Sequence, residues 1–223
     1  MASHLDLEEQ EQLDELKHFW KRWGDLITWL LIVVLGGYAA WMGWQSYAAK
    51  QALQSAALYD SVERSAVSGD DALLDRSLSD IKDKFAGTTY AQQAALLAAR
   101  VYQDKDRKAD AKAQLAWVID KAGDEGYQAL ARLRLAALLI DEKAYDEARK
   151  HLTAATPDAF APLMADRLGD LAMLQAQPAE AVQQYQKAWK GFEPNAEYRR
   201  LVAVKLAALG ADPEETAAVE TKK

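Results

Sequence analysis

The three histidines are the first residues to consider, because histidine is the side chain used most often for acid-base catalysis and metal binding. His4, His18 and His151 lie far apart in the sequence and on both sides of a long apolar segment, so no shared metal site is expected. Cysteine is absent, which excludes disulfides and thiol catalysis and fits a reducing or an oxidising compartment equally well.

One acidic cluster could suggest a calcium site. Asp70, Asp71 and Asp75 stand together, but the loop glycine and the closing glutamate of a calcium loop are missing, and aspartates that cap a helix start explain the group better. The chain also lacks a G-x-S-x-G motif, a phosphate-binding glycine loop and a dinucleotide fingerprint. The sequence therefore predicts no enzyme, with no catalytic, cofactor-binding or metal-binding residues. A hydrolase that uses residues outside these motifs is the alternative.

A membrane anchor is predicted near the amino terminus. The uncharged segment from Leu26 to Trp44 would be about 29 Å long as a helix, close to the roughly 30 Å hydrocarbon core of a bilayer. A buried core helix would need a polar face, and a cleavable signal peptide would have a shorter apolar run that ends in small residues. Tryptophans cluster at both ends of the segment, as in two aromatic belts: Trp20, Trp23 and Trp29, then Trp41 and Trp44.

The orientation of the anchor follows from its flanking cations. Lys17, Lys21 and Arg22 precede the span, whereas only Lys50 and Arg64 occur within the next 20 residues after Trp44. Lysine and arginine next to a span remain in the cytoplasm, so the amino terminus is predicted inside and the rest outside. The chain carries a net charge of -7, and no basic surface for nucleic acid stands out.

The part after the anchor is predicted to be all-α and repetitive. Ala, Leu, Gln, Glu, Lys and Arg dominate it, and glycine or proline interrupts it at intervals of one helix or one helical hairpin. A five-residue pattern with steps of 3, 9, 4 and 3 recurs at offsets of 37 and 33, which is near the period of the tetratricopeptide unit. The three copies are Ala99, Tyr102, Ala111, Leu115 and Val118; Ala136, Leu139, Ala148, Leu152 and Ala155; and Gly169, Ala172, Ala181, Tyr185 and Ala188.

In each copy, the small first and third residues are expected to let two antiparallel helices approach, and the larger fourth residue to fill the groove beside them. A further hairpin is predicted upstream, from helices through 55–66 and 73–85, and a capping helix over 197–209. The units lack the usual tryptophan and closing proline, so an irregular helical bundle is the alternative.

These patterns divide the chain into four predicted segments. Residues 1–23 form an acidic cytoplasmic tail with a basic juxtamembrane end, and residues 24–47 form the transmembrane anchor. Residues 48–209 form a tetratricopeptide-like solenoid on the outer side of the membrane, which is the periplasmic side if the protein is bacterial, and residues 210–223 form a disordered tail. The fold class is thus all-α: one transmembrane helix followed by a helical-repeat domain.

Two surfaces are candidate binding sites. In the span, Gly36, Ala39, Ala40 and Gly43 share one helical face, where small residues permit close contact with another helix, although glycine is also simply common in spans. In the repeats, the first helices of the hairpins are expected to line a groove that binds a partner chain through arginines and an aromatic residue, the alternative being ordinary solvated faces. Its candidate residues are Arg100, Gln103, Tyr127, Arg132, Arg134 and Arg167.

The order of these features resembles the bacterial YfgM family of ancillary SecYEG translocon subunits. The resemblance covers residues 9 to 209 and is most specific in "LKHFWKRWG" (16–24) and "PLMADRLGDLAMLQAQPAEAVQQYQKAWK" (162–190). It implies a single-span inner-membrane protein that associates with the SecYEG translocon and with a membrane-anchored periplasmic chaperone of the prolyl-isomerase type. It further implies an adaptor that helps pass exported proteins to chaperones, without a small-molecule substrate. A scaffold for envelope assembly that never meets the Sec channel is the alternative.

Overall fold

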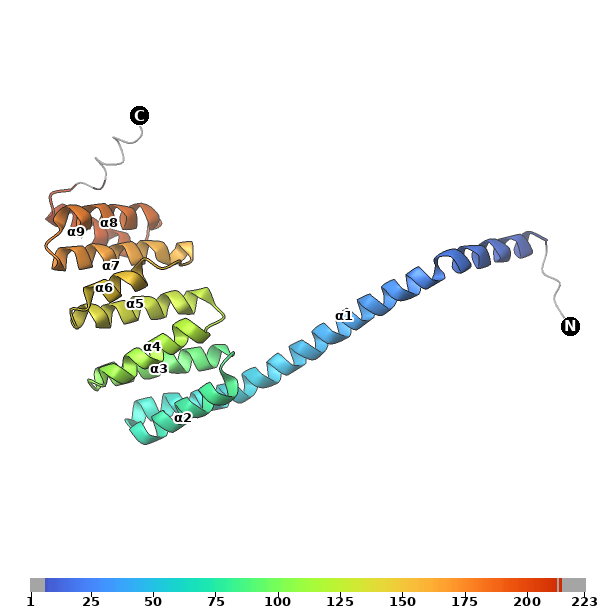
Figure 1. Ribbon diagram of the computed structural model, residues 1–223, viewed down its shortest axis with the longest axis horizontal. Helices are drawn as coiled ribbons and strands as arrows, with labels where there is room; N and C mark the ends of the chain where they lie inside the picture. Colours follow the sequence, from blue (N-terminus) through green and yellow to red (C-terminus); the bar gives the residue numbers. More distant parts are fainter. Residues whose placement is uncertain (1–6, 212, 214–223) are drawn as a thin grey trace, which may run out of the picture. The chain divides into compact units, whose positions relative to one another are not determined.

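The computed structural model describes residues 7–211 and 213, and every regular element in this part of the chain is helical. The described residues divide into two compact units, which meet between Leu53 and Gln54. The elements are α1 (Leu7–Ser68), α2 (Asp71–Phe85), α3 (Thr89–Asp104), α4 (Lys108–Lys121), α5 (Glu125–Asp141), α6 (Tyr145–Leu152), the short 3-10 helix η1 (Asp158–Phe160), α7 (Ala161–Leu174), α8 (Pro178–Gly191) and α9 (Glu197–Ala208) (Figure 1).

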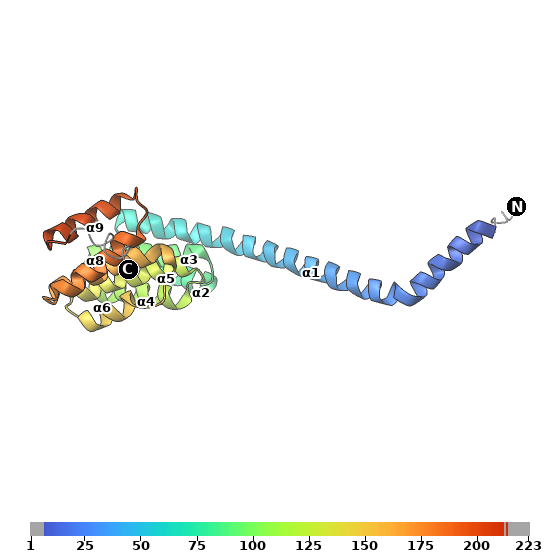
Figure 2. The same ribbon diagram turned by 90° about the horizontal axis from the view of Figure 1, so that it is seen from above.

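The amino-terminal unit consists of the first part of α1. This helix has the length and the apolar composition to cross a membrane, by those two criteria alone. From Leu26 through Trp44 its large apolar side chains are exposed, apart from the half-buried Ile27, and Figure 2 shows that the helix bends within its blue portion. The predicted boundary at residues 47 and 48 does not interrupt the helix, which continues to Ser68.

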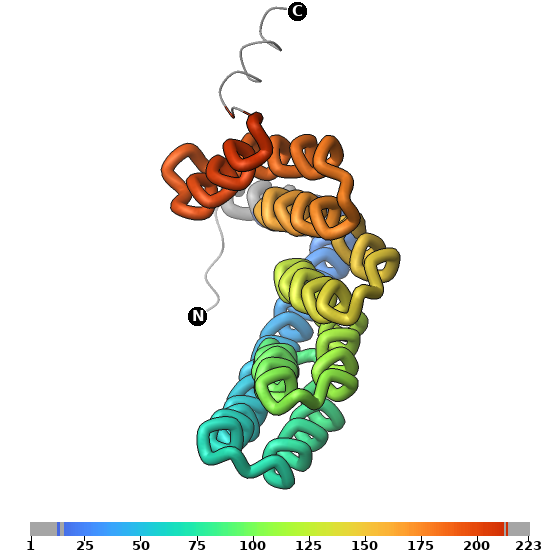
Figure 3. The backbone as a smooth tube through the Cα atoms, turned by 90° about the vertical axis from the view of Figure 1, so that its left-hand side faces the viewer, coloured from blue at the N-terminus to red at the C-terminus, as the bar shows by residue number. Residues whose placement is uncertain are grey.

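The repeat unit, which begins at Gln54, is a row of antiparallel hairpins. The end of α1 pairs with α2, where the hydroxyls of Ser61 and Ser77 lie 2.9 Å apart, and α3 with α4, α5 with α6 and α7 with α8 follow. Figure 3 shows the first helices α3, α5 and α7 in one row and the second helices α4 and α6 in the next; the rows bend, with the first helices on the inner side. The predicted upstream hairpin and the predicted capping helix, which is α9, are both confirmed.

The turn inside each of the three later hairpins has the same hydrogen bond. The backbone N–H of Arg107 donates to the carbonyl of Tyr102 at 2.7 Å, and equivalent bonds reach Leu139 at 2.8 Å and Ala172 at 2.9 Å. These three acceptors are the second residues of the three sequence copies. One residue of each turn has the left-handed conformation that glycine adopts most easily, with φ of 58°, 61° and 57° at Asp106, Lys143 and Ala176.

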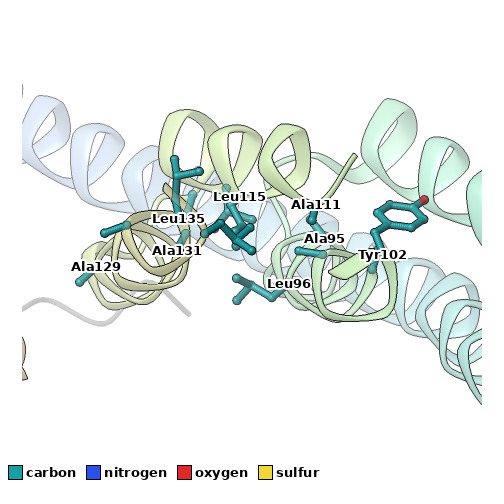
Figure 4. Close-up of a cluster of buried hydrophobic side chains, with 14 of the residues drawn as sticks. Ala95, Leu96, Tyr102, Ala111, Leu115, Ala129, Ala131 and Leu135 are labelled. Atoms are coloured by element: carbon teal, nitrogen blue, oxygen red, sulfur yellow. The ribbon is translucent and has the colours of Figure 1, made fainter. Parts of the chain in front are cut away.

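Small residues lie where the helices of a hairpin cross. Figure 4 shows Ala111 of α4 facing Ala95 of α3, and Leu115 pointing from α4 into the space between α3 and α5. Ala111 is fully buried and Leu115 is 2% exposed. In the last hairpin, the ring of Tyr185 covers Gly169 so closely that a Cβ atom at position 169 would lie 2.4 Å from it. The predicted roles of the small and large residues are confirmed.

The second copy of the pattern differs from the other two at its fifth residue. Ala155 is exposed and lies outside any helix, because α6 ends at Leu152. The hydroxyl of Thr153 donates to the carbonyl of Arg149 at 2.9 Å at this helix end. α6 has 8 residues, and Pro157, which biases Thr156 towards extended backbone, keeps the segment that follows from continuing as a helix.

A buried polar cluster attaches α9 to α7. Asp166 is completely buried, and Lys205 of α9 lies 2.7 Å from it and 2.7 Å from Asp170. The hydroxyl of Tyr198 donates to Asp166 at 2.9 Å, and that of Tyr185 to Asp170 at 2.8 Å. Burial and the hydrogen bond to Asp166 raise the pKa of Tyr198 to about 12, so this phenol remains a donor.

The contact between Gly169 and Tyr185 can be tested by Gly169→Ala. The Tyr185 ring is almost buried and its hydroxyl is bonded to Asp170, so it cannot move away cheaply. We expect a loss of about 1 to 3 kcal/mol in the free energy of unfolding of the detergent-solubilised chain, measured by chemical denaturation. Gly123→Ala is the control, because nothing lies within 4 Å of a Cβ atom there. If Gly169→Ala and Gly123→Ala changed the free energy of unfolding equally, the close contact between Gly169 and Tyr185 would be contradicted.

The left-handed turn residue can be tested by Ala176→Gly. Alanine at φ 57° is strained relative to glycine, and glycine removes a strain of about 1 to 2 kcal/mol while adding less than that in unfolded-chain entropy. We expect the same denaturation measurement to give a gain of up to about 1 kcal/mol. Ala113→Gly, at an exposed position inside α4, is the control and should destabilise the chain by about 0.5 to 1 kcal/mol. A lower free energy of unfolding in both variants would refute the left-handed turn conformation at Ala176.

Candidate protein-binding surface

The predicted groove residues all lie on first helices of hairpins. Arg100 and Gln103 belong to α3, Arg167 belongs to α7, and the remaining three belong to α5. These helices form the inner row of the repeat unit (Figure 3), as expected for the face that contacts a partner. The side chains, however, do not form one continuous patch.

Arg100 and Arg134 lie together across neighbouring first helices. An Nη1–H of Arg134 donates to the carbonyl of Leu96 at 3.3 Å, which joins α5 to α3. Burial lowers the pKa of Arg134, and the charge of Arg100 lowers it further. Arg100 has only a long contact of 3.9 Å with Asp104, and 76% of its side chain is exposed. Two neighbouring positive charges at this place favour an anionic group of a binding partner.

Arg132 points elsewhere. It lies two residues before Arg134, which is about 200° around a helix, and it donates to the carbonyl of Ala155 at 3.3 Å. It therefore links α5 to the segment between α6 and η1. Its charge also acts on His151 of α6. The structure thus separates Arg132 from the pair that the sequence placed it with.

Two other predicted groove residues, Arg167 and Gln103, lie apart from the pair formed by Arg100 and Arg134. Arg167 lies 3.1 Å from Asp170 on its own helix, next to the cluster that holds α9. Gln103 is exposed near the end of α3. Both positions are on the first-helix side of the unit, but neither has a contact that selects a partner.

Tyr127 belongs to a polar and aromatic row that crosses three hairpins. Its hydroxyl accepts a hydrogen bond of 2.8 Å from the Nε2 of Gln93 on α3. The rings of Tyr59 on α1 and Tyr90 on α3 have their centroids 5.7 Å apart. Burial, followed by a hydrogen bond with Glu63, raises the pKa of Tyr59 to about 12. Gln93, Tyr59 and Tyr90 were missed by the sequence-based prediction.

A periodic signal could have identified part of this row. Tyr90 and Tyr127 stand nine positions before Ala99 and Ala136, the first small residues of their copies, and Phe160 stands nine positions before Gly169. An aromatic residue therefore belongs to these three repeats, near the start of α3 and α5 and directly before α7. All three side chains pack against the main hydrophobic core.

Hollows beside α1 extend this surface. One has a volume of about 550 Å³ and is lined mainly by apolar atoms, from Ala66, Val67 and Leu97 together with Glu63 and Arg64. Val67 is 90% exposed. A second hollow, of about 510 Å³, shares Glu63 and Arg64 and adds Ala57 and Asp60. We define the first-helix face by these hollows together with Gln93, Arg100, Tyr127 and Arg134.

The first-helix face combines chemistry suited to a polypeptide. Apolar side chains at Val67 and Leu97 can receive an apolar anchor residue, while Arg100 and Arg134 can bind a carboxylate and the amide of Gln93 can bind polar backbone. Such a mixture is typical of grooves that bind a helix or an extended segment.

The residues that suggested metal binding have other roles. Asp70 is the N-cap of α2 and accepts from the backbone N–H of Leu73 at 3.0 Å. Asp71 pairs with Lys105, and Asp75 accepts from Tyr102 at 2.5 Å and lies 3.3 Å from Arg107. Among the side chains that the structure describes, no three histidine, cysteine, aspartate or glutamate residues are grouped as a metal site would require. His18 and His151 lie in different units, and His4 lies outside the described residues.

The small-residue face of the span lies in the amino-terminal unit. Gly36, Ala39, Ala40 and Gly43 are all exposed, and nothing lies within 4 Å of a Cβ atom at either glycine. Contact of this face with another helix remains a prediction.

The predicted tail of residues 210–223 falls largely outside the described residues. Gly210 and Ala211 follow α9 directly, and the backbone N–H of Ala211 donates to the carbonyl of Leu206 at 3.0 Å.

Comparison with known proteins gives one family model and three relatives that match most of the chain. The family model of the tetratricopeptide repeat-like domain matches residues 17–211. A protein of Neisseria gonorrhoeae (strain ATCC 700825 / FA 1090) named ancillary SecYEG translocon subunit is 34% identical over 94% of this chain and 100% of its own length. Proteins of the same name from Haemophilus influenzae (strain ATCC 51907 / DSM 11121 / KW20 / Rd) and Escherichia coli (strain K12) are each 26% identical, over 82% and 73% of this chain and 89% and 78% of their own lengths.

The burial of His151 and the nearby charge of Arg132 give a testable pH dependence. Burial lowers the pKa of His151 below its ordinary value of about 6.5, Arg132 lowers it further, and Glu147 opposes them. As the pH falls through about 6.5, the unfolded chain takes up a proton that the folded chain does not, so stability should fall until the lower folded pKa is passed. We expect NMR titration of the His151 imidazole to show the lowered pKa, and His151→Gln to remove this part of the pH dependence. A His151 pKa above 6.5 would contradict the burial.

Proposed function

The chain belongs to the YfgM family of tetratricopeptide-repeat-like proteins, and we propose that it is a membrane-anchored protein-protein interaction adaptor of the Sec translocon. The observation that carries the proposal is the match, over 94% of the chain, to a relative named ancillary SecYEG translocon subunit. The first-helix face supplies a surface of suitable chemistry for a polypeptide partner. The family and the repeat fold are of a non-catalytic kind.

The anchor of this proposal is the apolar part of α1. Its length and composition suit a membrane span, and the relatives are named as subunits of a translocon. We place the amino terminus in the cytoplasm, because Lys17, Lys21 and Arg22 precede the span and few cations follow it. The repeat unit is then periplasmic, and the chain is a single-pass protein of the bacterial inner membrane.

An anchored repeat unit acts by raising local concentration. Held at the membrane near the Sec channel, the first-helix face meets emerging chains or chaperones at a much higher effective concentration than a soluble domain would. We propose that its partners are the SecYEG translocon and a membrane-anchored periplasmic chaperone of the prolyl-isomerase type, and that it helps pass exported proteins to that chaperone. The proposed third partner is membrane lipid, which surrounds the apolar part of α1.

A scaffold for envelope assembly, independent of the Sec channel, is the second candidate. The same anchor and the same first-helix face would serve it, because neither feature selects one polypeptide partner over another. The two candidates differ in what the face contacts in the cell, and crosslinking distinguishes them.

The proposal is tested by a photo-crosslinking amino acid placed at Arg100 in intact cells. Arg100 is exposed on the first-helix face, and the control position Ala116 is exposed on the second helix α4. We expect crosslinks from Arg100 to a Sec subunit or to a periplasmic chaperone, several-fold more abundant than from Ala116. Capture of outer-membrane assembly proteins alone would favour the scaffold. Equal yields from both positions would reject the first-helix face as the binding surface.

A further inference from the structure

The helical segment that precedes the span has two chemically distinct sides. In a helix that turns about 100° per residue, its large apolar side chains fall within a sector of roughly 120°. The remaining sector carries Lys17, His18, Lys21 and Arg22, all exposed, and by its sequence also Asp14 and Glu15, so cations outnumber acidic residues there by three to two. The apolar members are Leu13, Leu16, Phe19, Trp20 and Trp23.

The apolar side of this segment is uncovered in the amino-terminal unit. Leu16 is 62% exposed, Phe19 51% and Trp20 58%. Aromatic and aliphatic side chains of this size, grouped on one side of a short helix, are costly to leave in water. The side therefore needs a partner surface that is apolar and wide.

Gly24 lies between this segment and the uncharged run that begins at Leu26. The indole of Trp20 lies over Gly24, with its Nε1 only 3.1 Å from where a Cβ atom would be, and Gly24 is buried. Figure 2 shows α1 bent within the blue portion of the helix. Glycine is a common cause of helix bends, because it lacks a side chain to stiffen the turn.

We propose that residues 13–23 form an interfacial helix, which lies on the cytoplasmic surface of the membrane with its apolar side in the lipid and its cations at anionic headgroups. The inference rests on the proposed membrane anchor, since the segment is continuous with the span and cannot leave the membrane surface by more than its own length of about 16 Å. Continuity selects lipid as the occupant of the apolar side. Lys17, Lys21 and Arg22 flank that side, where the headgroups of anionic lipids attract them.

The arrangement explains the two groups of residues before the span together. Cations alone would orient the anchor without any need for Leu13, Leu16 and Phe19. An aromatic belt alone would need tryptophans near the span but no apolar residues ten positions before it. An interfacial helix needs both, and it needs them on different sides of the helix, as they are here.

Spin labels on single cysteines test the inference, because the natural chain contains no cysteine and each label is unique. The full chain is reconstituted in vesicles of phosphatidylcholine and phosphatidylglycerol. Leu16→Cys and Phe19→Cys probe the apolar side, His18→Cys and Arg22→Cys the charged side, and Val33→Cys the span. The readout is the ratio of collision rates with oxygen, which enters lipid, and with a water-soluble nickel complex.

We expect a ratio several-fold higher at positions 16 and 19 than at positions 18 and 22, with the highest ratio at position 33. The contrast should shrink in vesicles of phosphatidylcholine alone, because the cations then lose their headgroup partners. An unchanged contrast in those vesicles would refute the assigned headgroup chemistry.

Three other results would overturn the inference. Equal exposure of all four sites to nickel would mean that the segment projects into water. A collision-rate ratio that changes steadily from position 16 to position 22 would mean that the segment continues the span. Shielding of the labels from both oxygen and nickel would mean that the segment packs on a second copy of the chain. Exposure of position 33 to nickel would instead refute the anchor itself, so the two proposals fail in distinguishable ways.

Discussion

Close contact between the two helices of each hairpin is the constraint on which the repeat unit depends. Ala111, Ala148 and Ala181 are fully buried, so no larger side chain separates the crossing backbones. Once they approach this closely, the connecting turn must be short and must reverse sharply, which explains why three turns share one hydrogen bond and one left-handed residue. The hairpins then stack through faces that none can cover alone, and the first helices come to lie in one row.

Much of this fold is predictable from the sequence, because small residues at fixed spacing are a direct signal of helix crossings. Ala155 differs from Val118 and Ala188, the fifth residues of the other two copies, because α6 ends at Leu152, and the spacing of the pattern does not show where that helix ends. The left-handed turn positions are invisible in the residue types, since aspartate, lysine and alanine occupy them. The uninterrupted passage of α1 from the apolar segment into the first hairpin was also not foreseen, because each part was recognised by a different pattern.

The candidate surface was predictable in location but not in detail. Sequence periodicity assigns a residue to a first helix, yet it does not say how far around that helix the side chain points. Arg132 and Arg134 illustrate this, since one contacts Ala155 and the other Leu96. Gln93 was missed because a lone glutamine carries no motif, although its bond to Tyr127 joins two hairpins. The aromatic residue at the beginning of each first helix was a usable signal that the five-residue pattern did not include.

The last hairpin of the row needs a covering element of its own, because no further hairpin follows it. Here α9 is attached through Asp166, Asp170 and Lys205 as well as through Val202 and Leu206, which are fully buried. A buried ion pair adds little stability compared with apolar packing, but a misplaced α9 would leave Asp166 buried without its cation. The polar cluster therefore specifies one position for α9, whereas apolar contacts between alanine-rich helices would tolerate several. A single defined end keeps the hairpins in register, and with them the side chains of the first-helix face.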